Sequence, residues 1–295
     1  MSQFVTLIAA AGQSALPEAA KAVADALDIR GAPDWLAPGL ACDLLCGNIA
    51  AGEAEAVARQ AVGDAAVDVL VQPAQGRRKR LLAADLESTM IENEMLDELA
   101  EFVGKREQVA EITRRAMNGE LDFIAALSAR VALLKGLPAS VLDEAAQRIR
   151  LMPGAGALVA TMRAAGARTL LVSGGFSVFV EPIAAELGFD RAVCNRLDLV
   201  EGRIAGTIAP PIVTREVKRD ALLAFAAESG IPLADCVAIG DGANDLPILD
   251  AAGLGIAFRA KPAVAAVARW RLDHADLTGV LYAQGYRREQ IVDRP

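Results

Sequence analysis

The sequence is poor in aromatic residues, and this shortage limits what its interior can contain. Phe, Trp and Tyr together make up 4% of the 295 residues, whereas hydrophobic residues make up 54%. The core must therefore consist mainly of Ala, Leu, Val and Ile, which is the usual content of α/β proteins with buried parallel strands. We expect an α/β fold, arranged in two domains at this chain length.

Cysteine and histidine are also scarce. Four scattered cysteines cannot build a disulfide framework, and the CDLLC segment lacks the second ligand pair that a zinc site needs. We expect all four cysteines to be reduced and structural. The single histidine, His274, lies away from the polar motifs, so neither a phosphohistidine mechanism nor a histidine-bound metal is expected.

The chain also lacks a surplus of positive charge and a long apolar run. Lys and Arg number 30 against 38 Asp and Glu, a net charge of -8, which argues against binding to the phosphate backbone of nucleic acid. No basic residue precedes Lys21, and no apolar run reaches the roughly 18 residues of a membrane span. We therefore expect a cytoplasmic protein whose partner is a small molecule, with no nucleic acid and no membrane.

Residues 1–74 predict a small α+β domain of the ferredoxin-like, or ACT-like, kind. The expected elements are strand, helix, one or two strands, helix and strand, over residues 4–11, 17–27, 33–48, 52–63 and 66–73. By analogy of fold alone, such domains serve as amino-acid sensors or dimer contacts, so a homodimer is one expected assembly. The basic segment QGRRKR predicts a linker that begins the second domain, 75–295.

Three short apolar runs in the second domain each end abruptly in polar or glycine-rich sequence. The runs are RLLAADLEST, ARTLLVSGG and DCVAIGDGAND. They predict strands of a Rossmann-like parallel sheet that is buried on both faces. Ligands of such sheets bind beyond the carboxyl ends of the strands, so Asp85, Ser173 and Asp241 should lie close together.

A long helical insertion, about residues 91–152, separates the first two of these strands. Its apolar residues recur at helical spacing, and one face carries Ile91, Met95, Leu99 and Phe102. A crossover between parallel strands needs only one helix, so several helices imply a helical cap placed over the strand ends. Such a cap can exclude water from a site beneath it.

Asp85 is the first candidate for chemistry, because a carboxylate at a strand end can attack phosphorus and form an acyl phosphate. Taken alone, it could equally be the N-cap of a following helix. Glu87 lies two residues further on and, in an extended chain, faces the same side. It suits a general acid, whose pKa should be raised by burial and by a neighbouring carboxylate.

Two carboxylates that face a phosphate need a cation between them. Asp241 and Asp245, in GDGAND, offer the hard oxygen ligands that suit magnesium, although the same segment could be only a turn. Ser173, Gly174 and Gly175 would offer a hydroxyl and open backbone N–H groups to phosphate oxygens. Together these segments predict a site for a phosphate group and a metal ion.

Lys218, in REVKRDALL, could add a point charge to the phosphate or be a solvated helix residue. The order of the pieces is more informative than any one of them. DLEST, VSGG, Lys218 and GDGAND resemble the four motifs of haloacid dehalogenase superfamily phosphatases. Further strings are similar to the phosphoserine phosphatase family over nearly all of 81–286: STMIENEMLDELA, ITRRAMNGELDF, ARVALLKGLP, LVSGGF, CNRL, VAIGDGANDLPIL and DLTGVLYAQGY.

The resemblance implies a role for each matching residue. Asp85 matches the nucleophile and a metal ligand, Glu87 matches the general acid and lends a backbone carbonyl to the metal, and Asp241 matches the second metal carboxylate. The implied cofactor is Mg2+. Residues that match the phosphate binders, or a residue near the phosphate, are Ser173, Gly174, Lys218 and Asn244.

The resemblance also implies how the substrate is selected. Glu94 and Arg130, both in the expected cap, match the pair that holds the amino and carboxylate groups of phosphoserine. A zwitterion needs one partner of each sign, although both residues could instead belong to a solvated helix face. Met117 and Phe123 match apolar residues that line the substrate pocket, while side chains at such spacing are more often core.

The implied reaction is hydrolysis of O-phospho-L-serine to L-serine and phosphate through an aspartyl-phosphate, the last step of serine biosynthesis. Alternative substrates are phosphothreonine, phosphohomoserine or another small phosphomonoester. A signalling receiver domain would also phosphorylate an Asp, but it has neither a helical cap nor a general acid two residues later. One departure is Glu87, where the family commonly has Asp, because the added methylene moves the proton donor by roughly 1.5 Å.

Overall fold

The N-terminal part of the chain folds as a four-stranded antiparallel sheet with two helices on one face. The computed structural model describes residues 2–12, 15–47, 49–117 and 121–293. The strands are ordered β2-β3-β1-β4, and the elements are β1 (Gln3–Ala9), α1 (Leu16–Ala26), β2 (Asp34–Ala37), β3 (Ala41–Cys46), α2 (Ala51–Val62) and β4 (Val67–Pro73). The expected βαββαβ order is confirmed.

The rest of the chain is built on a seven-stranded sheet in the order β11-β10-β9-β5-β6-β7-β8. Its strands are β5 (Leu81–Ala84), β6 (Arg168–Phe176), β7 (Arg191–Val200), β8 (Arg203–Ala209), β9 (Cys236–Gly240), β10 (Leu254–Phe258) and β11 (Trp270–Leu272). All neighbours pair in parallel except β7 and β8, which form an antiparallel hairpin. The α/β class with a mainly parallel sheet is therefore confirmed.

Strand β5 lies at the centre of this sheet and is buried on both faces. Leu81 and Ala83 belong to the apolar cluster beneath α9 (Arg215–Glu228) and α10 (Leu246–Ala251). Leu82 and Ala84 belong to the cluster on the other face, beneath α7 (Ala155–Ala164), α8 (Ser177–Leu187) and α12 (Gly279–Ala283). This alternation with a period of two explains why the strand is apolar without interruption.

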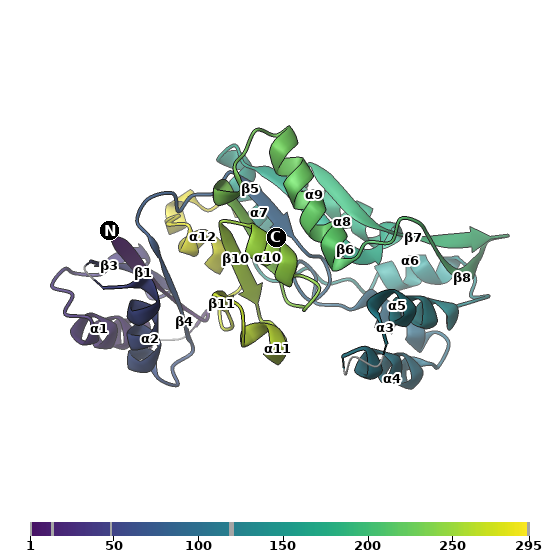
Figure 1. The fold of residues 1–295 in the computed structure, drawn as a ribbon, viewed down its shortest axis with the longest axis horizontal. Coiled ribbons are helices and arrows are strands. Elements are labelled where there is room, and N and C mark those ends of the chain that lie inside the picture. The colour runs from purple at the N-terminus through teal and green to yellow at the C-terminus, as the bar shows by residue number, and fades with distance from the viewer. Residues whose placement is uncertain (1, 13–14, 48, 118–120, 294–295) are drawn as a thin grey trace.

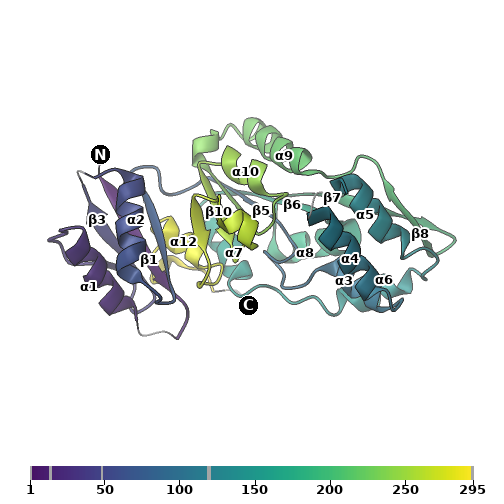
Figure 2. The same ribbon diagram turned by 60° about the horizontal axis from the view of Figure 1, so that its bottom comes forward.

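Four helices lie between β5 and α7 along the chain: α3 (Met95–Glu101), α4 (Arg106–Met117), α5 (Phe123–Ala132) and α6 (Ser140–Ala146). They lie at one end of the molecule, and the N-terminal sheet lies at the other (Figure 1; Figure 2). The β7–β8 hairpin packs against α5 and the residues that follow it. Gly206 on β8 has φ +83°, and a Cβ there would lie 2.9 Å from the Cβ of Lys135. Only glycine gives this backbone the required conformation and clearance.

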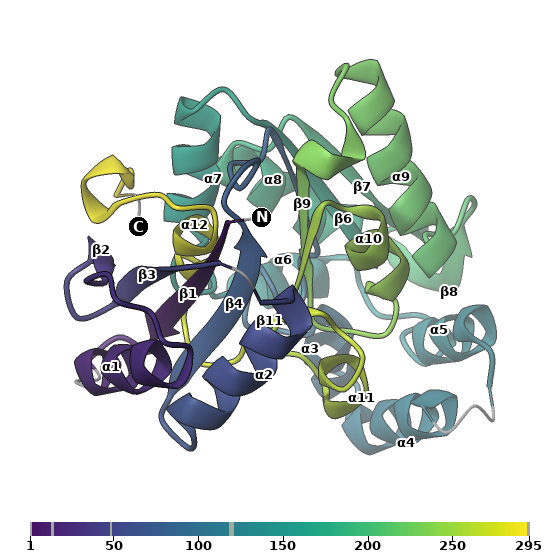
Figure 3. The ribbon, with the colours of Figure 1, turned by 60° about the vertical axis from the view of Figure 1, so that its left-hand side comes forward.

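The two sheets meet where β4 lies beside β11 (Figure 3). The indole Nε1 of Trp270 donates a hydrogen bond to the carbonyl of Val71 at 3.0 Å. The buried carboxylate of Asp68 accepts backbone N–H groups from residues 273–275, including that of His274, whose side chain is exposed. Arg77, from the connection between the sheets, pairs with Asp43 and is also buried. This junction is therefore polar as well as apolar.

Two observations bear on the expected environment of the protein. All four cysteines are free, as expected for structural thiols. Within the described part of the chain, no helix combines the length and the apolar character that crossing a bilayer would require.

Candidate active site

Two aspartates stand side by side at the carboxyl edge of the large sheet. Asp85 follows β5 and Asp241 follows β9, and these strands pair in parallel. The backbone N–H of Asp85 donates to the carbonyl of Ile239 at 3.0 Å, which continues the ladder and fixes the position of Asp85. The two aspartates are 6% and 5% exposed.

Lys218, in the second turn of α9, joins this edge from the side. Its Nζ lies 2.8 Å from Oδ2 of Asp85 and 2.8 Å from Oδ1 of Asp245, and the side chain is 1% exposed. Burial alone would lower the pKa of Lys218, but Asp245 and Asp85 raise it above its ordinary value. The lysine is therefore a buried cation held between two carboxylates and not a solvated helix residue.

The carboxylates of Asp85, Asp241 and Asp245 form an acidic cluster in which one oxygen of each lies within 4.8 Å of the others. Burial, with the charge of Asp245, raises the pKa of Asp85 to about 7 against the opposing effect of Lys218. Such buried negative charge favours binding of a cation, and carboxylate oxygens suit a hard divalent ion. The residues therefore fit a divalent metal ion.

Asp245 has a structural task within this cluster. Besides the Lys218 contact, its Oδ2 accepts the backbone N–H of Gly242 at 3.0 Å. A Cβ at Gly240 would overlap this carboxyl group, so only glycine at the end of β9 lets Asp245 approach. Both carboxylate oxygens are engaged within the protein, which favours a role in orienting Lys218 and the turn after β9.

Glu87 reaches the same edge from the loop that leads into the helical insertion. Its Oε1 accepts the N–H of Met95, the first residue of α3, at 3.0 Å. Burial, followed by the charge of Glu94, raises its pKa to about 8. Its Cδ would lie 3.4 Å from a Cβ placed at Gly175. A carboxyl group that keeps its proton at neutral pH therefore faces the glycine pair that follows Ser173.

The backbone around Gly174, near the end of β6, is held by side chains from β6 and β7. Ser173 is 1% exposed, and its Oγ accepts the N–H of Gly175 at 3.0 Å. Asn195, on β7, donates from Nδ2 to the carbonyl of Gly174 at 2.7 Å and accepts the N–H of Val213 at 2.7 Å. These bonds fix the backbone that the sequence identified as a phosphate cradle.

Residues of the helical insertion cover this edge. Arg130, on α5, is partly buried, and burial lowers its pKa while Asp97, Glu87 and Glu94 act in the opposite direction. Glu94 precedes α3 and accepts a hydrogen bond from Ser88 Oγ at 2.8 Å. The insertion therefore brings one anion and one cation to the site.

Of the three remaining expected residues, the structure describes the side chains of two. Phe123 comes over the glycine loop, with its Cζ 3.9 Å from the position of a Cβ at Gly174. Asn244 is partly buried in the turn after β9. The side chain of Met117, at the end of α4, lies outside those that the structure describes.

Comparison with known proteins agrees with this geometry. Residues 82–250 match the family model of the haloacid dehalogenase-like hydrolases. The chain belongs to this family. Curated relatives are phosphoserine phosphatases of Mycobacterium tuberculosis, at 43% identity over 89% of this chain and 65% of the relative, and of Streptomyces coelicolor, at 45% over 76% and 55%. The chain thus spans well under two thirds of the second protein's length and just under that share of the first.

Other relatives of this haloacid dehalogenase-like chain are matched over nearly their whole length. A phosphoserine phosphatase of Streptococcus thermophilus is 45% identical over 94% of its own length and 69% of this chain. A solved haloacid dehalogenase family hydrolase from Salmonella enterica serovar Typhi superposes with a TM-score of 0.87 at 28% identity, covering 96% of this chain and 98% of that one. A structure described as a phospho-aspartyl intermediate analogue of phosphoserine phosphatase gives 0.66 at 38% identity, over 70% and 98%.

Two polar residues of this haloacid dehalogenase-like site were missed by the sequence reasoning. Asn195 belongs to the CNRL string, but nothing in that string indicates which backbone its amide would hold. Lys261 lies in FRAKP after β10, and its Nζ is 3.3 Å from Asp241 Oδ2. A lysine before a proline is ordinary in a loop, so only the fold shows where these residues lie.

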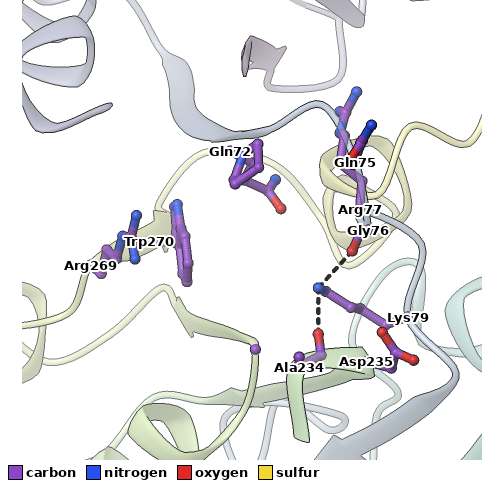
Figure 4. Close-up of a pocket in the computed structure, with 11 residues that line it drawn as sticks. Gln72, Gln75, Gly76, Arg77, Lys79, Ala234, Asp235, Arg269 and Trp270 are labelled. Carbon is purple, nitrogen blue, oxygen red and sulfur yellow. Dashed lines mark hydrogen bonds between the residues drawn. The ribbon is translucent and has the colours of Figure 1, made fainter. Parts of the chain in front are cut away.

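A separate cavity of about 290 Å3 lies at the opposite edge of the sheet (Figure 4). It is formed by the connection between the two sheets and by residues at the amino ends of β9, β10 and β11, including Asp235, Gly253 and Trp270. Lys79 spans one side by donating to the carbonyls of Gly76 and Ala234. This cavity does not include the acidic cluster, so we assign the chemistry to the carboxyl edge of the sheet.

Proposed function

We propose that this chain hydrolyses O-phospho-L-serine to L-serine and phosphate, with Asp85 as the nucleophile. The observation that carries the proposal is the pairing of two unlike carboxyl groups at one strand end. Asp85 has Lys218 at 2.8 Å, which favours its ionised form although burial raises its pKa to about 7, whereas burial and the charge of Glu94 raise the pKa of Glu87 to about 8. One group can attack while the other donates a proton.

In the first step, a carboxylate oxygen of Asp85 forms a bond to the phosphorus as the bond from phosphorus to the serine oxygen breaks. The leaving alkoxide takes the proton of Glu87, which gives serine, an aspartyl-phosphate and the Glu87 carboxylate. The backbone N–H of Gly174, a residue whose carbonyl is fixed by Asn195, would donate to a phosphoryl oxygen. Lys218 favours the ionised form of Asp85, against burial and the charge of Asp245, and adds positive charge beside the phosphate.

In the second step, the Glu87 carboxylate accepts a proton from a water molecule, and the water oxygen attacks the phosphorus. The bond from phosphorus to Asp85 breaks, which releases phosphate and restores both carboxyl groups. The same residue thus donates a proton in one half of the cycle and removes one in the other, as microscopic reversibility allows.

The cation in this proposal is Mg2+, which the carboxylates of Asp85 and Asp241 and the backbone carbonyl of Glu87 would hold. When bound, it would neutralise the charge that accumulates on the phosphoryl oxygens. The buried acidic cluster supports a divalent ion, and its oxygen ligands suit magnesium. Asp245 is a less favoured metal ligand, because both of its oxygens already have partners within the protein.

Recognition of the serine part is assigned to Glu94 for the ammonium group and to Arg130 for the carboxylate. Their opposite charges and their place over the site support this choice, as do the names of the relatives. Phe123 would pack against the substrate from above Gly174. The implied place in metabolism is the last step of serine synthesis, and the free thiols favour a reducing compartment such as the cytoplasm.

The domain organisation that goes with this activity is residues 1–74, a linker that opens the second domain at 75, and a cap over about 91–152. The N-terminal sheet contacts the large sheet through β4 and β11, and the cap would lie over the carboxyl edge. An association of two copies through the N-terminal sheet stays a prediction, to be measured by the mass of the protein in solution.

A phosphate-release assay tests the activity. The protein would be offered phosphoserine, phosphothreonine, phosphohomoserine and a sugar phosphate, each with Mg2+ and with a chelator. Phosphoserine should have the highest kcat/KM, and the chelator should remove the activity. Preference for another phosphomonoester would overturn the substrate, and turnover by Asp85→Asn at the wild-type rate would overturn the mechanism.

A further inference from the structure

Lys261 connects the sheet to the helical insertion directly above the candidate site. It lies between β10 and α11 (Pro262–Ala265), and its backbone N–H donates to the carbonyl of Asp241 at 3.1 Å. Its Nζ lies 3.3 Å from Oδ2 of Asp241 and 3.6 Å from Oε1 of Glu94. One side chain thus contacts a carboxylate of the sheet edge and a carboxylate of the insertion.

Glu94 is held from a second direction by Ser88. The Ser88 hydroxyl donates to Oε1 of Glu94 at 2.8 Å, and Ser88 itself has φ +54°, in the left-handed region that few residues other than glycine adopt. Such backbone strain is retained where the surrounding structure fixes it, commonly at functional sites. The contacts of Glu94 with Ser88 and with Lys261 both involve the same oxygen, Oε1.

This shared use of Oε1 has a consequence for recognition. A carboxylate oxygen that accepts the Ser88 hydroxyl and has the Lys261 ammonium group 3.6 Å away is less open to a further strong donor than its partner oxygen. The second oxygen, Oε2, is then the one left for the ammonium group of a substrate. Rotation of the carboxylate would otherwise exchange the two oxygens, so the two contacts also set the angle at which Glu94 faces the site.

The ion pair of Lys261 with Glu94 adds little to folding. The Lys261 and Glu94 side chains are 45% and 43% exposed, and pairs in such positions contribute about 0–1 kcal/mol because water screens them. Asp241, in contrast, has a side chain that is 7% exposed and is fixed by the end of β9. The lysine is therefore anchored at the end of β9, where its backbone N–H also donates to the Asp241 carbonyl, and its side chain reaches a half-exposed carboxylate.

We propose that Lys261 is a positioning residue for substrate recognition, which holds Glu94 so that Oε2 faces the ammonium group of phosphoserine. The inference rests on the proposed function, since it concerns the same substrate. It predicts that Lys261 affects binding of the amino group and leaves phosphoryl transfer itself largely unchanged.

The test compares phosphoserine with 3-phosphonooxypropanoate, which differs from it only by lacking the amino group. Lys261→Met should raise KM for phosphoserine by about tenfold, with little change in kcat, because one oriented ionic contact is weakened. For 3-phosphonooxypropanoate, kcat/KM should change less than about twofold. Lys261→Arg should restore most of the phosphoserine affinity, because it keeps the charge at a similar reach.

A matched control removes a neighbouring cation that has no contact with the site. The side chain of Arg150 is 77% exposed and lies 3.6 Å from Glu92. Arg150→Met breaks this pair and should leave the kinetics of both substrates unchanged. Binding of phosphoserine measured by calorimetry in an Asp85→Asn background gives a second readout without turnover. There, adding Lys261→Met should raise Kd by about the same factor as KM.

Two results would overturn the inference. Equal losses on the two substrates would place Lys261 in the shared phosphoryl-transfer machinery, and unchanged kinetics on both would show that Glu94 does not need it. Hydrolysis of phosphoserine by the wild-type protein is measured in the same series. If it fails, the proposed function is wrong, irrespective of what the Lys261 variants show.

Discussion

The sheet side and the cap side of the site are held in different ways. On the sheet side, Lys218 and Asp245 are each 1% exposed and lie 2.8 Å apart. On the cap side, Glu94 is 43% exposed and its ion pair with Lys261 is 3.6 Å long. A buried pair is costly to disturb, whereas an exposed one is easily rearranged. The fixed half suits phosphoryl transfer, and the adjustable half suits selection of the group that carries the phosphate.

The largest expected effect comes from removing the carboxylate at the centre of the sheet side. Asp85→Asn keeps the shape of the side chain but cannot form the acyl phosphate, so kcat should fall by more than ~10³-fold, or about 4 kcal/mol. Stopped-flow and steady-state phosphate release would measure it. A loss below tenfold would show that another group is the nucleophile. Phosphoryl transfer could then no longer be assigned to the sheet side.

Lys218→Met tests how strongly the buried charges depend on one another. The variant leaves Asp85 and Asp245 buried without their cation, which should lower the free energy of unfolding by about 3–5 kcal/mol and Tm by roughly 10 °C. Lys261→Met is the matched variant on the cap side, where the expected loss is below about 1 kcal/mol. If thermal unfolding showed equal losses of stability in the two variants, the sheet side would not be held more firmly than the cap side.

Glu87→Gln separates proton donation from phosphoryl transfer. The leaving serine needs the proton, so kcat for phosphoserine should fall by about 10²-fold, whereas an activated aryl phosphate should be much less affected. Parallel assays of both substrates check this. Losses of the same size on the two would argue that Glu87 holds the site together and does not act as an acid.

Glu94→Gln should have a smaller effect, confined to the cap side. It removes the charge that faces the ammonium group, so KM for phosphoserine should rise by about tenfold while turnover of an aryl phosphate stays within about twofold. Arg130→Gln should do the same for the carboxylate group. If phosphoserine kinetics stayed unchanged in both variants, a different phosphomonoester would become the better substrate.

The smallest effect is a pH dependence. Because the pKa of Glu87 is raised to about 8, its acid form persists at neutral pH, and kcat for phosphoserine should decline as pH rises through about 8. A raised pKa in the folded state also means that the protonated form stabilises the fold. This contribution is complete below the ordinary value of 4.5 and is lost as pH rises through about 8. In Glu87→Gln, the plot of kcat against pH should lack this decline near pH 8.

The comparison also explains what the sequence could and could not predict. Asp85 and Asp241 could be placed because each ends an apolar run, and parallel strands bring their ends to one edge. The contact of Lys218 with Asp245, 27 residues away, depends on the direction of α9 relative to β9. No local pattern encodes that angle, so the sequence alone left Lys218 open to being a solvated residue.

Asn195 and Lys261 show a second limit of sequence reasoning. Each acts on a backbone or a carboxylate that comes from another part of the chain, and each stands in a segment with no unusual composition. The carboxyl group of Glu87 illustrates the opposite case, since a raised pKa is predictable in direction from burial and a nearby carboxylate, although the structure shows that this carboxylate is chiefly Glu94 and only to a lesser degree Asp85. Chemistry carried by neighbours in sequence can be predicted, while support from distant loops requires the fold.

The position of Asp85 has an evolutionary consequence. Strand β5 sends Leu81 and Ala83 to one core face and Leu82 and Ala84 to the other, and Asp85 continues the same ladder. A deletion or insertion of one residue would exchange the two faces and turn the aspartate away from its partners. Selection for a packed core therefore also guards the reactive group against changes in chain length, so this strand should drift by substitution and hardly ever by insertion or deletion.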